Sequence, residues 1–130
     1  HVWCWGWNTF GQLGDGTTNT RTTPTQISLL NAASKISLGY FHSCVVDNLS
    51  DLWCWGNNYY GNLGLGTTSQ KHVPTKVTAV DNVVQVSAGH YFTFLVDGND
   101  NIMSMGYNNY GQLGLGHTKD RNTPTLLTGI

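Results

Sequence analysis

The strongest constraint on the fold is that the sequence repeats at a fixed spacing of 50 residues, with no gap in the alignment. Residues 3–6 align with residues 53–56 and 103–106, and a Gly-rich run follows each of these segments. A fixed period of this length is typical of solenoids, propellers and repeat arrays. The chain therefore folds as a series of similar units and not as one irregular domain.

Each period contains several short runs of β-prone residues, at 35–38, 42–46 and 51–55 in the first period. Gly, Asp and Asn separate these runs, and no amphipathic helix is visible. The polar stretch 47–51 is typical of a hairpin loop, which makes the flanking strands antiparallel neighbours. We predict an all-β fold of propeller-type blades, each with about four antiparallel strands, because radial repetition protects sheet edges.

The repeated segments resemble the repeats of the regulator of chromosome condensation family. The resemblance rests on WGNNYYGNLGLG at 55–66, PT at 74–75 and SAGH at 87–90, and it covers essentially the whole chain. It implies a seven-bladed propeller with about 50 residues per blade. The 130 residues would then form a single repeat domain, with segments 1–50, 51–100 and an incomplete 101–130, or about two and a half blades.

An incomplete ring leaves unpaired sheet edges, which must be covered. Further repeats outside this stretch could cover them, and the strand-like run beginning at His1 favours sequence upstream. Alternatively, copies of the chain could associate head to tail into a ring or a filament. The sequence leaves both possibilities open.

The Gly-rich run after each Trp or Met segment has no Lys and no helix behind it, so it does not match a phosphate-binding loop. We expect its glycines to form tight turns at positive φ, its Asn to cap those turns, and its Leu to pack between blades. The repeated structural positions are Gly6, Asn8, Gly11, Leu13, Gly14, Gly56, Asn58, Gly61, Leu63, Gly64, Gly106, Asn108, Gly111, Leu113 and Gly114.

The cysteines predict a disulfide. Cys44 and Cys54 flank the turn 47–51, and both are replaced together in the next period, by Phe94 and Ser104. Cys4 is equivalent to Cys54, so its partner would lie upstream or on another chain. Because disulfides persist in oxidising compartments, we expect an extracellular or cell-surface protein. Three reduced cysteines in a cytoplasmic protein are the alternative.

The composition argues against several classes of partner. Charged residues make up 10% of the chain, with only 6 Lys+Arg and a formal net charge of -1. Nucleic acid is therefore not an expected partner. No run approaches the roughly 18 to 20 apolar residues of a membrane-spanning helix, so membrane insertion is not expected.

The sequence predicts no catalytic residue, no cofactor and no metal site. Its histidines show no pair at metal-ligand spacing, and no nucleophile motif or pair of acidic residues is visible. His42 is assigned a packing role, because Phe92 replaces it one repeat later. Asn48 begins an Asn-Leu-Ser pattern at the predicted turn and is a possible N-glycan acceptor.

The aromatic residues divide into recurring and varying positions. Phe10, Tyr60 and Tyr110 recur at one place in the period, which favours packing. Varying aromatic positions are better candidates for contacts, since aromatic side chains anchor protein interfaces and stack on sugars. The possible partner contacts are therefore Trp7, Tyr59 and Tyr107.

Three functions follow as hypotheses. The first is a non-catalytic extracellular binding or scaffold module that presents propeller loops to a protein or glycan. The second is a structural subunit that self-assembles through open β-edges. The third, implied by the resemblance alone, is guanine-nucleotide exchange on a small nuclear GTPase with chromatin binding. It would need a reducing compartment and a basic surface, and the sequence indicates neither.

Overall fold

The computed structural model describes residues 1–28 and 31–130, and within these residues it consists of β-strands, turns and loops without a helix. The all-β prediction is therefore confirmed. The strands are β1 (Val2–Gly6), β2 (Arg21–Ile27), β3 (Ala33–Leu38), β4 (His42–Asp47), β5 (Leu52–Gly56), β6 (Lys71–Lys76), β7 (Val83–Ala88), β8 (Phe92–Asp97), β9 (Ile102–Gly106) and β10 (Arg121–Leu126).

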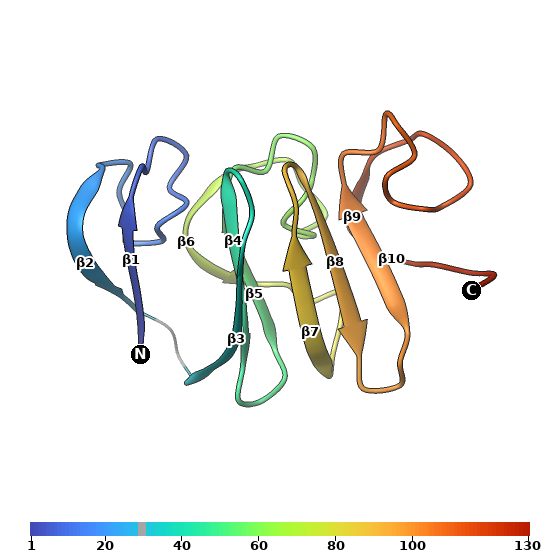
Figure 1. Ribbon diagram of the computed structural model, residues 1–130, viewed down its shortest axis with the longest axis horizontal. Helices are drawn as coiled ribbons and strands as arrows, with labels where there is room; N and C mark the ends of the chain where they lie inside the picture. The colour runs from blue at the N-terminus through green and yellow to red at the C-terminus, as the bar shows by residue number, and fades with distance from the viewer. Residues whose placement is uncertain (29–30) are drawn as a thin grey trace.

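The strands form three sheets that stand side by side along the chain (Figure 1). Two sheets have four antiparallel strands, in the orders β3-β4-β5-β6 and β7-β8-β9-β10, and β1 pairs with β2 in a third. A 50-residue shift carries β1 and β2 onto β5 and β6, so the first sheet corresponds to the last two strands of a blade. The structure is a partial propeller. Each complete blade spans the border between two of the segments counted from residue 1.

The hairpin turn at 47–51 forms because one carboxylate organises it. Asp47 Oδ1 accepts the backbone N–H groups of Leu49 and Asp51, each at 2.9 Å. Asp47 Oδ2 accepts the indole N–H of Trp53 at 3.0 Å. Burial alone raises the pKa of Asp47, but the hydrogen bonds from Asn31, Asp51, Trp53 and Leu49 outweigh it, and the net pKa is lowered.

The core lies between neighbouring sheets, because alternate side chains of each strand point to opposite faces. In β5, Trp53 and Trp55 belong to the apolar cluster shared with β1 and β2, whereas Leu52 and Cys54 belong to the cluster shared with the third sheet. Loop residues complete both clusters. Leu13 packs into the first cluster and Leu63 into the second, which is the inter-blade position expected from the sequence.

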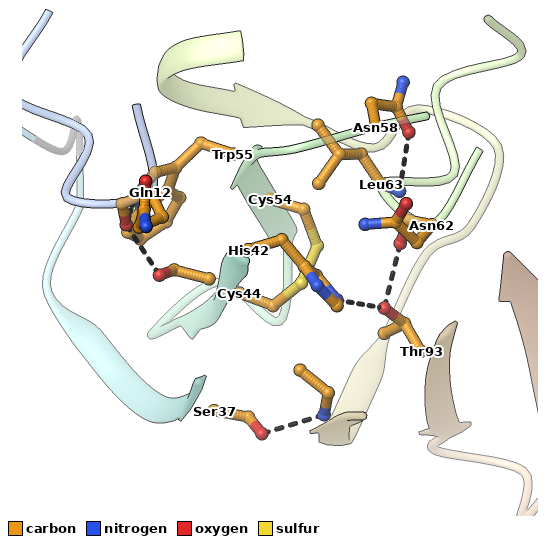
Figure 2. Close-up of a disulfide and its surroundings, with 12 residues drawn as sticks. Gln12, Ser37, His42, Cys44, Cys54, Trp55, Asn58, Asn62, Leu63 and Thr93 are labelled. Atoms are coloured by element: carbon orange, nitrogen blue, oxygen red, sulfur yellow. Dashed lines mark hydrogen bonds between the residues drawn. A yellow bond between two sulfur atoms is a disulfide. The ribbon is translucent and has the colours of Figure 1, made fainter. Parts of the chain in front are cut away.

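Hydrogen bonds repeat across the two interfaces between sheets. Ser43 Oγ donates to the carbonyl oxygen of Gln12 at 2.7 Å, and the equivalent Thr93 Oγ1 donates to the carbonyl oxygen of Asn62 at 2.8 Å. The indole N–H of Trp55 donates to the same Gln12 carbonyl at 2.9 Å (Figure 2). Each loop is therefore tied to the following sheet by polar contacts as well as by apolar packing.

Cys44 and Cys54 form a disulfide, as the sequence predicts. The two residues are direct cross-strand partners on β4 and β5, with their Cα atoms 4.2 Å apart, and both side chains are fully buried (Figure 2). Cys4 is buried and carries a free thiol. Burial raises the pKa of Cys4, and the charge of Asp15 raises it further, which keeps the thiol protonated at neutral pH.

His42 is buried between the second and third sheets and takes part in an inter-blade hydrogen-bond chain. Its Nε2 lies 2.8 Å from Thr93 Oγ1 (Figure 2). Because the Thr93 hydroxyl donates its proton to Asn62, the imidazole Nε2–H must be the donor to Thr93. Nδ1 is buried without a hydrogen-bond partner among the described residues. Protonation there would create an unsatisfied N–H, and burial lowers the pKa of His42 to about 4.

This burial predicts a pH-dependent stability. Unfolding returns the pKa of His42 from about 4 to its ordinary 6.5, so the unfolded chain binds more protons between these values and stability falls as pH falls. We expect the free energy of unfolding to drop by about 2 kcal/mol from this group between pH 7.5 and pH 5. Urea unfolding at several pH values measures the drop.

The matched control for this prediction is His42→Phe, because Phe92 occupies the equivalent position one repeat later. The substitution removes the titrating group and leaves the Thr93 hydroxyl bonded to Asn62. An equal loss of stability in both proteins between pH 7.5 and pH 5 would assign the effect to other groups.

Candidate functional site

The long loops gather at one end of the strands, which we call the loop face, at the top of Figure 1. Three long loops, 7–20, 57–70 and 107–120, connect the last two strands of each sheet. The short turns 39–41 and 89–91 lie at the same end. The hairpin turns 48–51 and 98–101 lie at the opposite end, which we call the turn face.

The long loops are held in one conformation by a buried Asn. Asn58 Nδ2 donates to the carbonyl oxygens of Thr67 and Ser69, each at 2.9 Å, and Asn58 Oδ1 accepts the N–H of Leu63 at 3.0 Å. Asn8 and Asn108 make the equivalent bonds, and all three Asn side chains are fully buried. The nine repeated glycines have φ between +71° and +107°. The three loops therefore share one conformation, held by equivalent hydrogen bonds.

Aromatic rings form a continuous row along this face, from the first sheet to the third. Neighbouring rings in it have centroids 4.5 to 6.0 Å apart. We call this set the aromatic row. Its members are Trp7, Phe10, Tyr40, Phe41, Tyr59, Tyr60, His90, Tyr91, Tyr107 and Tyr110.

The row is continuous because the short turns bridge neighbouring loops. Phe41 packs edge-on against Trp7 and Phe10, with ring centroids 5.6 and 5.0 Å apart, and stacks on Tyr91 at 5.2 Å. Tyr91 in turn packs against Tyr60 at 5.0 Å. Edge-to-face and offset contacts of this kind are favourable beyond the area that they bury.

The structure brings the three possible contact residues together with the aromatic residues that the sequence assigns to packing. Tyr59 is 73% exposed and Trp7 is 51% exposed, and both stand on partly buried rings. Tyr110 is 86% exposed, because no sheet follows its own in the described residues. Phe10 and Tyr60 each pack against a ring in the turn of the following sheet. Within the described residues, the ring of Tyr110 packs against Tyr107 of its own loop.

Sequence reasoning missed four members of the row, Tyr40, Phe41, His90 and Tyr91. They occupy the two positions after Gly39 and the two positions after Gly89. The recurrence of two neighbouring rings in consecutive repeats could therefore have identified them. Tyr40 stacks on His90 with ring centroids 4.5 Å apart, across the boundary between two sheets. Only the topology shows that these turns lie beside the long loops.

Comparison with known proteins places the chain in a family. The model described as "Regulator of chromosome condensation (RCC1) repeat" matches residues 1–46, 50–96 and 99–130, and a second model of the same description matches 33–62 and 83–112. The chain belongs to the RCC1 repeat family. No curated protein sequence matches it significantly.

Solved structures of RCC1-type propellers agree with this assignment. Prp20p from Saccharomyces cerevisiae is 25% identical, with a TM-score of 0.89 over 96% of this chain and 33% of Prp20p. Yeast RCC1 (Prp20) bound to Kap60 is 23% identical, with a TM-score of 0.85 over 98% and 32%. Human WBSCR16 is 24% identical, with a TM-score of 0.86 over 98% and 33%. The chain spans about a third of the length of these propellers.

Charge is distributed unevenly between the two ends of this RCC1-type segment. The aromatic row contains no Asp, Glu, Lys or Arg. The loop face carries four of the chain's 6 Lys+Arg and two of its 7 Asp+Glu, whereas the turn face carries most of the carboxylates. The charged residues of the loop face are Asp15, Arg21, Lys71, Lys119, Asp120 and Arg121.

Other chemistry is sparse in residues 1–28 and 31–130. No group of three His, Cys, Asp or Glu side chains is arranged to hold a metal ion. No helix in these ranges is long and apolar enough to cross a membrane. Asn48 is exposed in a hairpin turn of the turn face, far along the strands from the aromatic row.

Proposed function

We propose that this chain is a non-catalytic binding module whose aromatic row contacts a protein partner. The observation that carries the proposal is a row of aromatic rings on hydrogen-bonded loops, in which Trp7, Tyr40, Tyr59 and Tyr110 are at least half exposed. Tyr and Trp are enriched among the residues that dominate binding energy. Because the loops are already held by Asn8, Asn58 and Asn108, little conformational freedom is lost on binding.

The disulfide supports an oxidising compartment, and we propose an extracellular or cell-surface location on this basis. An N-linked glycan on Asn48 would sit on the turn face and leave the aromatic row open. A cytoplasmic protein with reduced cysteines is the alternative.

The solved neighbours support a protein as the partner. One title describes the binding of Prp20p to Gsp1p and histones, and another describes yeast RCC1 bound to Kap60. A glycan partner would use the same exposed rings and is the second choice at this site. Nucleotide exchange with chromatin binding ranks last, because the net charge is -1 and the disulfide favours an oxidising compartment.

Self-assembly through the edges of the sheets is the alternative to partner binding, because an unpaired strand edge can accept a strand from another copy. Sedimentation velocity of the 130-residue chain over a range of concentrations distinguishes assembly from partner binding.

The binding proposal predicts that replacing Trp7 and Tyr59 together with Ala weakens the partner complex roughly thirtyfold. A photo-crosslinking amino acid at Tyr107 captures the partner from the native extracellular medium. Calorimetry with the purified partner then measures the dissociation constant. The fold should be nearly unchanged, since both substituted side chains are at least half exposed.

The matched control is Leu49→Ala, which removes an apolar side chain of similar exposure, 66%, from the turn face. Its dissociation constant should equal that of the unmodified chain. A control variant that weakens binding as much as the aromatic double variant would move the contact surface to the turn face.

A further inference from the structure

The cation at the start of the last strand of each sheet has a carboxylate partner in one blade and lacks it in another. Arg21, Lys71 and Arg121 are equivalent residues, 50 positions apart. Arg21 Nε donates to Asp15 Oδ2 at 2.6 Å. In the third sheet Leu115 stands at the position of Asp15, and Arg121 forms no ion pair with the residues that the structure describes.

Arg121 is held in place without being neutralised. It is half-buried, and its Nη2 lies 2.8 Å from Nε2 of His117. A guanidinium presents five N–H donors in a planar fork that matches a carboxylate. Most of that donor capacity is free in Arg121.

Arg121 opens into a groove beside the aromatic row. The groove has a volume of about 240 Å³ and is lined by Arg121, Tyr59, Tyr60 and three polar neighbours, Thr68, Asp120 and Asn122. One oxygen of the Asp120 carboxylate already has a hydrogen-bond partner, because Oδ1 accepts the backbone N–H of Asn108 at 2.8 Å. The equivalent place between the first two sheets has Thr9, Phe10 and Gln70 in place of Tyr59, Tyr60 and Asp120.

We infer that this groove takes a carboxylate of the protein partner, from an Asp or Glu side chain, in a fork-like contact with Arg121. The inference rests on the proposed function, because it assigns the chemistry of the same partner. In the first sheet the equivalent cation, Arg21, already binds a carboxylate of the chain itself through its Nε–H. The loop face has more cations than carboxylates, which complements an acidic segment whose apolar side chains contact the aromatic row.

The test uses the 130-residue chain and two end-blocked octapeptides, one of alternating glutamate and leucine and one with glutamine in place of glutamate. The side-chain Nε–H resonances of Arg121 and Arg21 are followed by NMR during titration. We expect the glutamate peptide to shift the Arg121 resonance and leave Arg21, already bonded to Asp15, unchanged. The glutamine peptide should shift neither arginine.

Two variants complete the test. Arg121→Gln should weaken glutamate-peptide binding about tenfold, the effect of losing one charge-assisted contact. Arg121→Lys keeps the positive charge but loses the planar pair of donors. Its affinity for the glutamate peptide should therefore lie between those of the unmodified chain and Arg121→Gln. Lys35→Gln on the far part of β3 is the control and should change nothing.

The outcomes separate this inference from the proposed function. Tyr59 and Tyr60 ring resonances that shift while Arg121 stays fixed would overturn the carboxylate subsite and leave the aromatic row as a binding surface. An Arg121 shift without any ring response would support the subsite and contradict the aromatic row. Equal responses to the glutamate and glutamine peptides would overturn the subsite.

Discussion

Replacing Gly14 with Val is expected to lower the free energy of unfolding by about 4 kcal/mol, the largest effect that the structure predicts. Two costs combine at this position. The backbone has a φ of +79°, which a β-branched residue strongly resists. A Cβ atom would lie 2.6 Å from Nε1 of Trp55, whose indole is fully buried and bonded to the Gln12 carbonyl. Urea unfolding followed by tryptophan fluorescence measures the change.

Gly116→Val separates the two costs. Gly116 has nearly the same φ, +75°, but a Cβ atom there would meet nothing within 4 Å. This variant should lose only the backbone share of the effect, about 1 to 2 kcal/mol. Equal losses at Gly14 and Gly116 would mean that close packing of the loop against Trp55 contributes nothing.

The repeat made the fold predictable, because the sequence encodes the same local structure three times. Gly14 and Gly64 occupy equivalent places, and each abuts the equivalent residue of the following sheet, Trp55 or Met105. A recurring Gly, Asn or Leu therefore indicated a recurring contact. The pairing of Cys44 with Cys54 was predictable for the same reason, since both disappear together in the next period.

The candidate site was only partly predictable, because it depends on contacts between residues far apart in sequence. Phe41 and Tyr91 contact each other across 50 positions, and nothing local to either turn indicates that contact. Tyr110 has the same place in the period as Phe10 and Tyr60 but is far more exposed, because no sheet follows its own in the described residues. Exposure depends on the neighbouring sheet as well as on the residue itself.

Removing the disulfide is the second large prediction. Replacing both Cys44 and Cys54 with Ala should lower the free energy of unfolding by about 3 kcal/mol, because the bond closes a short loop in the unfolded chain. The bond joins residues 10 positions apart and lies within the apolar cluster between the second and third sheets. Alanine leaves no buried thiol or hydroxyl unpaired there. Unfolding in urea, with and without a reductant, measures the loss.

The reductant supplies the decisive comparison for this prediction. It should destabilise the unmodified chain by nearly as much as the double substitution does, and it should leave the double variant unchanged. Cys4→Ala, which removes the free thiol, should respond to reductant like the unmodified chain. An unmodified chain that is indifferent to reductant would show that the cross-link does not stabilise the fold. Two free thiols at these positions in protein from its native source would remove the support for an oxidising compartment, and the partner would then be sought inside the cell.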